Sequence, residues 1–233
     1  MRDRPNWQRH FFYRKESIKT TWRLRLAILI LVILIGSATR AFWVSRIGHS
    51  LVCTEEIGRS DVMLVENFDP HYLPFERAAE LRRAGVASRV LIPTQANIVS
   101  KGIAELMTRL AGIPNPEIIQ VREIEPISLN LAYQIRDFLV KEQLRSVIIV
   151  TAGFRSKRSS LVYHAVLDPY GIKVRCLPVF GNITPENWTG TWHGIQDVTQ
   201  QFLKLQYYRF YVLFYLSGLP ASEQHASGPT SPA

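Results

Sequence analysis

Residues 61–219 alternate between two patterns of apolar and polar positions. Short, nearly continuous apolar runs are typical of strands buried on both faces, and apolar residues three or four positions apart are typical of amphipathic helices. The predicted strands are 61–65, 89–92, 117–121, 147–150 and 172–179, and the predicted helices are 74–84, 98–111, 129–142, 156–167 and 199–219. Strands that alternate with helices predict βαβ units, hence an α/β fold with a parallel sheet of about five strands.

The junction after the fourth predicted strand carries the strongest functional signal. Small residues follow Val150, and Ser156 is predicted to cap the next helix, as Ser128 is predicted to cap the helix 129–142. Ligands of open α/β sheets bind at the carboxyl ends of the strands. Arg155, Lys157 and Arg158 lie at this end, beside the first N–H groups of the helix, and so favour an anionic ligand. A basic helix start that faces water is the alternative interpretation.

A membrane anchor is predicted near the N-terminus. The thirteen residues 26–38 carry no charge, and with the residues to Val44 they form a largely apolar stretch of 19 that contains Arg40. Because Arg25 and Arg40 can reach the two interfaces, we interpret 26–44 as an uncleaved transmembrane signal anchor. A cleavable signal peptide and a buried helix of a soluble fold are the alternatives.

The positive charge of the chain is concentrated before this segment. The net charge is +9, of which residues 1–25 contribute eight basic and two acidic side chains, whereas residues 41–233 have a net charge of only +2. A nearly neutral body argues against a nucleic-acid partner. Basic residues before a span predict a cytoplasmic segment 1–25, a single pass through the inner membrane and a periplasmic C-terminal domain.

The remaining segments complete the predicted organisation. Residues 45–60 are expected to link the anchor to a domain at 61–219, and the Ser- and Pro-rich residues 220–233 are expected to be a disordered tail. The helix 199–219 is rich in aromatic residues, which either pack on the sheet or touch the membrane surface.

Polar side chains gather where the predicted strands end. Because these ends converge on one edge of a parallel sheet, carboxylates and arginines would meet there and suit a phosphate- or sugar-bearing ligand. No metal site, no cofactor motif and no phosphate-binding glycine loop is found in the sequence. Cys53 and Cys176 form either a disulfide or two buried thiols. The polar set consists of Glu66, Asn67, Asp69, Thr94, Gln95, Glu123, Glu125, Ser128, Asn130, Thr151, Arg155 and Arg158.

Several short motifs lie between residues 60 and 208. They are Asp61-Val-Met-Leu-Val65, Arg77 with Ala79, Leu81 and Gly85, Ala104-x-x-Met107, Leu110-x-Gly112-Ile113-Pro114, Glu125-x-x-Ser128-x-Asn130, and Val150-Thr151 with Arg158. In this order the motifs resemble the YdcF/SanA/ElyC-like family of bacterial envelope proteins. The resemblance implies a Rossmann-like α/β fold, often behind a membrane segment, and a role in surface polysaccharide or cell-wall metabolism.

The resemblance also implies roles for individual residues. Glu125 and Ser128 would be the catalytic candidates, and the ligand-binding candidates would be Arg77, Asn130, Thr151 and Arg158. Arg155 is added to the ligand-binding candidates from the basic start of the helix after the fourth strand, not from the resemblance. The chain departs from the family pattern after its first strand, where residues 66–69 replace a glycine-rich loop, and it has Arg155 where the family has a histidine. It therefore resembles a divergent member.

Two functional hypotheses follow. In the first, the protein is a membrane-anchored envelope protein that binds a small phosphate- or sugar-bearing metabolite, with Arg155 and Arg158 holding the anion; whether it also acts on that metabolite is left open. In the second, it is a non-catalytic scaffold that binds envelope-assembly proteins. A soluble nucleotide-dependent enzyme conflicts with the N-terminal segment and lacks a phosphate-binding motif.

Overall fold

The structure is a computed structural model of the chain and describes residues 22–67 and 72–214. These residues belong to two compact units, which divide between Ala41 and Phe42. The predicted tail, most of the basic segment 1–25, Asp69 and the end of the helix predicted at 199–219 lie outside the described residues.

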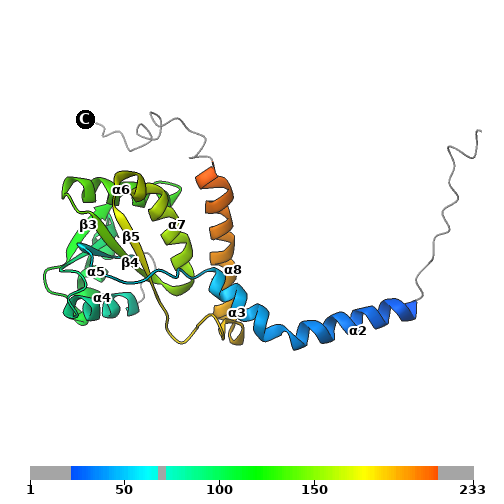
Figure 1. Cartoon of the computed structure of the whole chain (residues 1–233). Coiled ribbons are helices and arrows are strands. Elements are labelled where there is room, and N and C mark those ends of the chain that lie inside the picture. The colour runs from blue at the N-terminus through cyan, green and yellow to red at the C-terminus, as the bar shows by residue number, and fades with distance from the viewer. Residues whose placement is uncertain (1–21, 68–71, 215–233) are drawn as a thin grey trace, which may run out of the picture. The chain divides into compact units, whose positions relative to one another are not determined.

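Helices and strands alternate through the second unit, as the sequence pattern predicts (Figure 1). Two helices precede the sheet, α2 (Trp22–Ala38) and α3 (Arg40–Ser50). The strands are β1 (Val62–Val65), β2 (Arg89–Gln95), β3 (Glu117–Val121), β4 (Ser146–Ala152) and β5 (Lys173–Val179). The helices among and after them are α4 (Leu73–Arg83), α5 (Ile98–Ala111), α6 (Ile127–Lys141), α7 (Ser156–Leu167) and α8 (Trp192–Tyr207), which a π-helical turn, Tyr208–Val212, continues. Short 3₁₀ turns lie at Gly153–Arg155, Asp168–Tyr170 and Trp188–Gly190.

All five strands are parallel, in the order β3-β2-β1-β4-β5. This confirms the α/β class and the Rossmann-like parallel sheet. Each face of the sheet packs on its own helices: side chains of α6 and α7 pack on one face with Leu64 and Ile149, and side chains of α4 and α5 pack on the other with Met63 and Ile148. The neighbouring strand residues alternate between the two cores because successive side chains of a strand point to opposite faces.

The order reverses between β1 and β4. From β1 the chain builds outward through β2 and β3, and it then returns to place β4 on the other side of β1. In open parallel sheets, a crevice for ligands forms outside the carboxyl ends of the two strands at such a reversal. The ends of β1 and β4 are therefore where a site is expected on topological grounds.

The prediction that two serines cap helices is wrong. Ser128 lies inside α6, which follows Pro126, and Ser156 is the first residue of α7 rather than its cap. In each case the hydroxyl bonds to a distant part of the chain: Ser128 Oγ accepts from Arg158, and Ser156 Oγ accepts from the N–H of Cys53. The last helix also begins earlier than expected, at Trp192, where the Thr191 hydroxyl accepts from the N–H of Gly194.

The segment predicted to span the membrane is divided between α2 and α3. Every residue of α2 is outside the protein interior. Among the described residues no single helix has both the length and the apolar composition of a membrane span, and α2 and α3 meet these criteria only as a pair with a break at Thr39. Part of the segment expected to be a linker packs in the body, since Leu51 and Cys53 are buried.

Candidate functional site

The buried carboxylate of Glu66 lies at the carboxyl end of β1, beside the end of β4. Its Oε2 atom accepts hydrogen bonds from the Thr151 hydroxyl at 2.6 Å and from the Ser159 hydroxyl at 2.7 Å. Arg155 Nε forms an ion pair with the same oxygen at 3.3 Å. The cluster joins β1, β4 and the start of α7, at the reversal of strand order. Because its members are buried, it holds fixed charges in a region of low dielectric constant, where their effect on a neighbouring group is large.

Tyr163 extends the Glu66 cluster into the core. Its side chain is fully buried on α7, and its pKa is raised well above 10, first because burial disfavours the phenolate and second because Glu66 is negatively charged. The phenol therefore stays neutral at physiological pH. Such a residue can orient the carboxylate, but it cannot serve as a base.

Arg158 forms a second buried cluster, one turn further along α7. Its guanidinium donates to Ser128 Oγ at 2.5 Å and to the Gln201 side-chain oxygen at 3.2 Å, and it lies over the ring of Tyr208 at 5.5 Å. The Tyr208 hydroxyl in turn accepts from the N–H of Ser128 at 3.0 Å. The cluster thus joins α6, α7 and α8. The fold brings Arg158 and Ser128 together, although 30 residues of sequence separate them.

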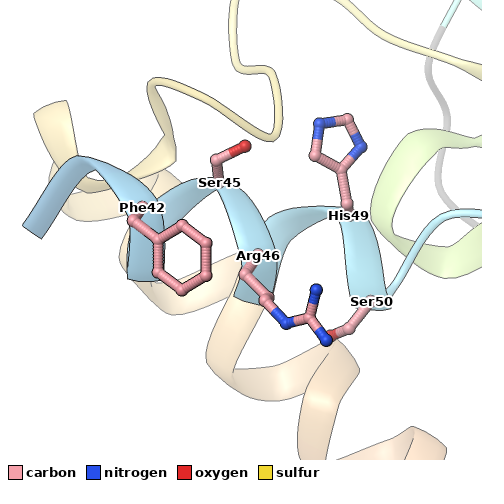
Figure 2. Close-up of a pocket in the computed structure, with 5 residues that line it drawn as sticks. All are labelled: Phe42, Ser45, Arg46, His49 and Ser50. Atoms are coloured by element: carbon pink, nitrogen blue, oxygen red, sulfur yellow. The ribbon is translucent and has the colours of Figure 1, made fainter. Parts of the chain in front are cut away.

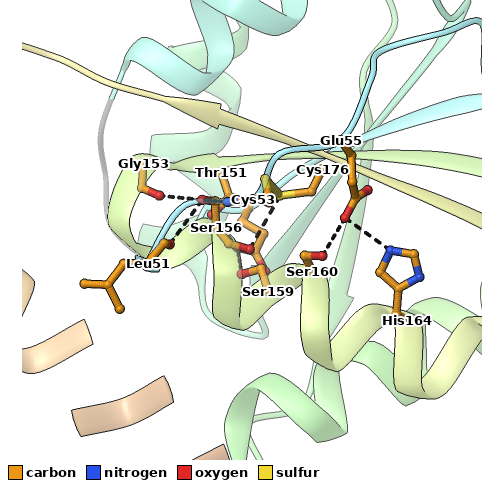
Figure 3. Close-up of a disulfide and its surroundings, with 11 residues drawn as sticks. Leu51, Cys53, Glu55, Thr151, Gly153, Ser156, Ser159, Ser160, His164 and Cys176 are labelled. Atoms are coloured by element: carbon orange, nitrogen blue, oxygen red, sulfur yellow. Dashed lines mark hydrogen bonds and ion pairs between the residues drawn. A yellow bond between two sulfur atoms is a disulfide. The ribbon is translucent and has the colours of Figure 1, made fainter. Parts of the chain in front are cut away.

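The N-terminus of α7 is occupied by the chain itself. The carbonyl oxygen of Leu51 accepts from the N–H of Lys157 at 3.0 Å, in the place where an anion would bind a free helix end. Cys53 forms a disulfide with Cys176 of β5, and the N–H of Cys53 donates to Ser156 (Figure 3). The disulfide therefore fastens Cys53 to β5, and the hydrogen bonds to Ser156 and Lys157 fasten residues 51–53 to the start of α7.

A cavity of about 190 Å³ opens beside these clusters. It lies where β4 and β5 end, next to the start of α4 and to α8. The rings of Phe154 and Phe180 meet edge to face at 5.5 Å, and a side chain at Gly153 would overlap the Phe180 ring. The lining residues include Leu73, Pro74, Gly153, Phe154, Phe180, Asn182, Ile183 and Asp197. The cavity offers aromatic faces together with an amide and a carboxylate, a combination that suits a neutral polar ring.

The other predicted site residues lie outside these two clusters. Arg77 is exposed on α4 and forms an ion pair with Glu80 at 2.6 Å. Glu125 is exposed before α6, where its carboxylate accepts from the N–H of Ile127 at 3.3 Å. Asn130 is partly buried on α6, and its amide donates to the carbonyl of Pro126 at 3.5 Å. Of the seven predicted residues, Ser128, Thr151, Arg155 and Arg158 belong to the buried clusters.

Sequence reasoning missed Ser159, Tyr163 and Gln201. Ser159 and Tyr163 follow Arg155 on α7 at intervals of four, so helical spacing would have placed them on one face with it. No local pattern marks Gln201, which meets Arg158 across 43 residues of sequence. Among the described residues no group of three or more histidine, cysteine, aspartate or glutamate side chains could hold a metal ion.

No family model, curated protein or solved structure matches the chain. The resemblance to the YdcF/SanA/ElyC-like family therefore remains a prediction from the short motifs.

Proposed function

We propose that the protein is a membrane-anchored envelope protein whose Rossmann-like domain binds a phosphate- or sugar-bearing metabolite at the carboxyl edge of its sheet. The observation that carries the proposal is the pairing of a cavity with buried charges at one place. Near the end of β4 Thr151 bonds to Glu66, and the chain continues into Gly153 and Phe154, which line the cavity. Buried charges disfavour folding unless they are fully paired, and they are frequent at functional sites.

The anchor is supported by α2 and by the charge distribution. Among the described residues none of the apolar side chains of α2 is buried, and basic residues precede the helix. Helices that are apolar on all sides are typical of a membrane environment. The Cys53–Cys176 disulfide supports a domain on the outer side of the inner membrane, because disulfides persist in oxidising compartments.

Within this proposal the cavity favours a sugar-bearing ligand. Phe154 and Phe180 provide apolar faces for a sugar ring, and Asn182 and Asp197 can bond to its hydroxyls. The carboxylate of Asp197 would repel a phosphate placed against it, so a phosphate would lie toward Arg155. Arg158 and Ser128 act as positioning residues, since they hold α6, α7 and α8 together.

Ligand binding can be tested on the full chain in detergent, by thermal shift with nucleotide sugars, sugar phosphates and lipid-linked sugars. A ligand at 100 times its dissociation constant should stabilise the fold by about 2.7 kcal/mol. Asp197→Asn should weaken binding, and Asp137→Asn, which changes an exposed carboxylate on α6, should not. A well-folded chain that none of these ligands stabilises would contradict the proposal.

A second function, an interaction module of an envelope-assembly complex, is favoured by α8 and its π-helical turn. Their exposed apolar side chains are Trp192, Phe202, Leu203, Tyr207, Phe210, Tyr211 and Phe214. Under this hypothesis, replacing Phe210 and Tyr211 by serine should abolish capture of the envelope-assembly partner, whereas Asp197→Asn should leave that capture unchanged. The opposite pattern supports ligand binding.

A further inference from the structure

The face of α3 that points away from the body carries a groove. The groove has a volume of about 600 Å³ and is lined by Phe42, Ser45, Arg46, His49 and Ser50 (Figure 2). Its cavity is distinct from the one at the strand ends, and its residues take no part in the Glu66 and Arg158 clusters. A groove of this size can hold a small polar group.

The opposite face of α3 is fixed to the body. Val44 and Gly48 are buried, and the carbonyl of Val44 accepts from the indole N–H of Trp188 at 2.9 Å. A side chain at Gly48 would overlap the backbone of Pro185. Since residues of an α-helix are about 100° apart, Arg46 lies roughly 200° around the helix from both Val44 and Gly48. The body therefore holds α3 with Arg46 turned outward.

Arg46 provides the charge of the groove. No hydrogen bond or ion pair of its guanidinium is found within residues 22–67 and 72–214, and Phe42 precedes it by one helical turn. His49 is held at the groove by Glu186, whose carboxylate lies 2.9 Å from the imidazole. The Ser50 hydroxyl donates its proton to the carbonyl of Ile47, so Ser45 is the hydroxyl among these lining residues that can donate to an anion. An arginine beside such a hydroxyl and an aromatic ring favours an anionic group attached to an apolar one.

The groove follows the apolar helix α2 closely along the chain. Only three residues separate Ala38 from Phe42, so the Cα atoms of these two residues are at most about 14 Å apart. If α2 is in the membrane, this short connection keeps Phe42 near the headgroups. Phe42 and Trp43 are exposed, as interfacial aromatic residues are.

We infer that the α3 groove binds the phosphate of an anionic phospholipid headgroup, with Arg46 as its counter-charge and Phe42 against the glycerol and acyl region. This inference rests on the proposed membrane anchor and adds a lipid site to it. It gives α3 a role in orienting the body at the membrane surface, because Arg46 and the buried residues Val44 and Gly48 lie on opposite faces of α3.

The test uses the full chain in detergent micelles, titrated with phosphatidylglycerol or with phosphatidylcholine, with bound lipid measured by native mass spectrometry. The wild type should prefer phosphatidylglycerol. Arg46→Gln should weaken phosphatidylglycerol binding about fivefold, the value of one basic residue at an anionic surface. Lys204→Gln, which removes the same charge from an exposed position on α8, should leave it unchanged. An Arg46→Gln chain that keeps the preference overturns the inference.

Two further measurements separate the possible failures. Flotation of the full chain with phosphatidylcholine vesicles after an alkaline wash tests the anchor alone. Chains that do not float contradict the anchor and with it the lipid site, whereas chains that float without a preference for phosphatidylglycerol contradict only the lipid site. Inorganic phosphate should not displace the lipid; displacement at matched phosphate concentration would indicate a free-phosphate site and overturn the inference.

Discussion

The carboxyl and amino ends of the parallel strands, which we call the carboxyl and amino edges of the sheet, each carry a glutamate paired with an arginine. The surroundings of the two pairs are opposite. At the carboxyl edge the Arg155 and Glu66 side chains are 9% and 2% exposed, and at the amino edge those of Arg89 and Glu117 are 31% and 33% exposed. Arg89 bonds to both oxygens of Glu117, at 2.6 and 2.7 Å, and also to Glu142 at 3.1 Å. Judged by hydrogen-bond distances alone, the pair of Arg89 and Glu117 at the amino edge is the better formed of the two.

The comparison shows that a well-formed ion pair is not by itself a sign of a functional site. An exposed ion pair contributes about 0–1 kcal/mol to stability, and water can replace either partner. A buried pair must recover the cost of removing both charges from water, and hydrophobic residues of similar volume often stabilise a fold more. The Glu66 cluster is therefore poorly explained by stability alone, which is consistent with a site at the carboxyl edge.

The largest expected effect concerns Glu66. Glu66→Ala leaves Arg155, Thr151 and Ser159 buried without their common acceptor and should lower the free energy of unfolding by about 3–5 kcal/mol, measured by urea denaturation of the full chain. Glu117→Ala is the matched control at the amino edge and should cost about 0.2–1 kcal/mol. Equal costs for the two variants would contradict the contrast between the edges.

The disulfide should have the next largest effect. Replacing Cys53 and Cys176 together by serine opens a loop with a sequence separation of 123 residues and should cost about 2–4 kcal/mol. Amide hydrogen exchange should increase at residues 51–53 and at the start of α7, since the disulfide holds Cys53 on β5 and residues 51–53 bond to the start of α7. Unchanged exchange there, or a larger increase around β3, would show that the disulfide does not secure the carboxyl edge.

An effect of intermediate size on stability is expected from Asp61, at the amino edge. Its carboxylate accepts from the N–H groups of Arg145 and Ser146, each at 2.8 Å. Asp61→Ala should therefore cost about 1–2 kcal/mol. The bond from Arg145 is the main reason that the pKa of Asp61 is below 3.8, so its contribution is present above about pH 3.8 and is lost as the pH falls through the lower folded value. Denaturation of Asp61→Asn across this range should show a smaller pH dependence than the wild type.

The smallest expected effect is the pH dependence from Glu117. Hydrogen bonds from Arg89 lower the pKa of Glu117 below 4.5. Because the folded value is the lower one, the stability it gives is fully present above about pH 4.5 and decreases as the pH falls through the folded pKa. Glu117→Gln should reduce this acid-side slope and cost less than about 1 kcal/mol at neutral pH. A variant with the slope of the wild type would show that Arg89 contributes nothing to the acid stability of this edge.

The sheet was predictable from sequence because its signals are local. The helix 98–111 and the strand 117–121 have the predicted bounds, and each shows its own periodicity within a few residues. Helix starts were less predictable: Ser128 and Ser156 have the residue type of caps, but long-range partners use their hydroxyls.

The candidate site was predictable only in part. Parallel topology brings Thr151 and Arg155 to the strand-end edge, which the order of elements already indicates. Arg158 is buried because Gln201 and Tyr208 contact it. No local pattern in the sequence specifies where the helix that carries these two residues lies on the sheet. The occupation of the α7 N-terminus by Leu51 is likewise a long-range contact. Exposure of a charged residue depends on what packs over it, and this information is not contained in its neighbours along the chain.

The bond between Cys53 and Cys176 closes a covalent ring that contains all of β1 to β4 and the first half of β5. A protease that cuts once inside this ring, for example between α4 and β2, produces two polypeptides that still migrate as one on a non-reducing gel and separate after reduction. A cut between β5 and α8 lies outside the ring and releases the C-terminal piece directly. The oxidation state of one cysteine pair thus decides whether a cut in the sheet domain leaves the N-terminal part of the chain joined to the rest.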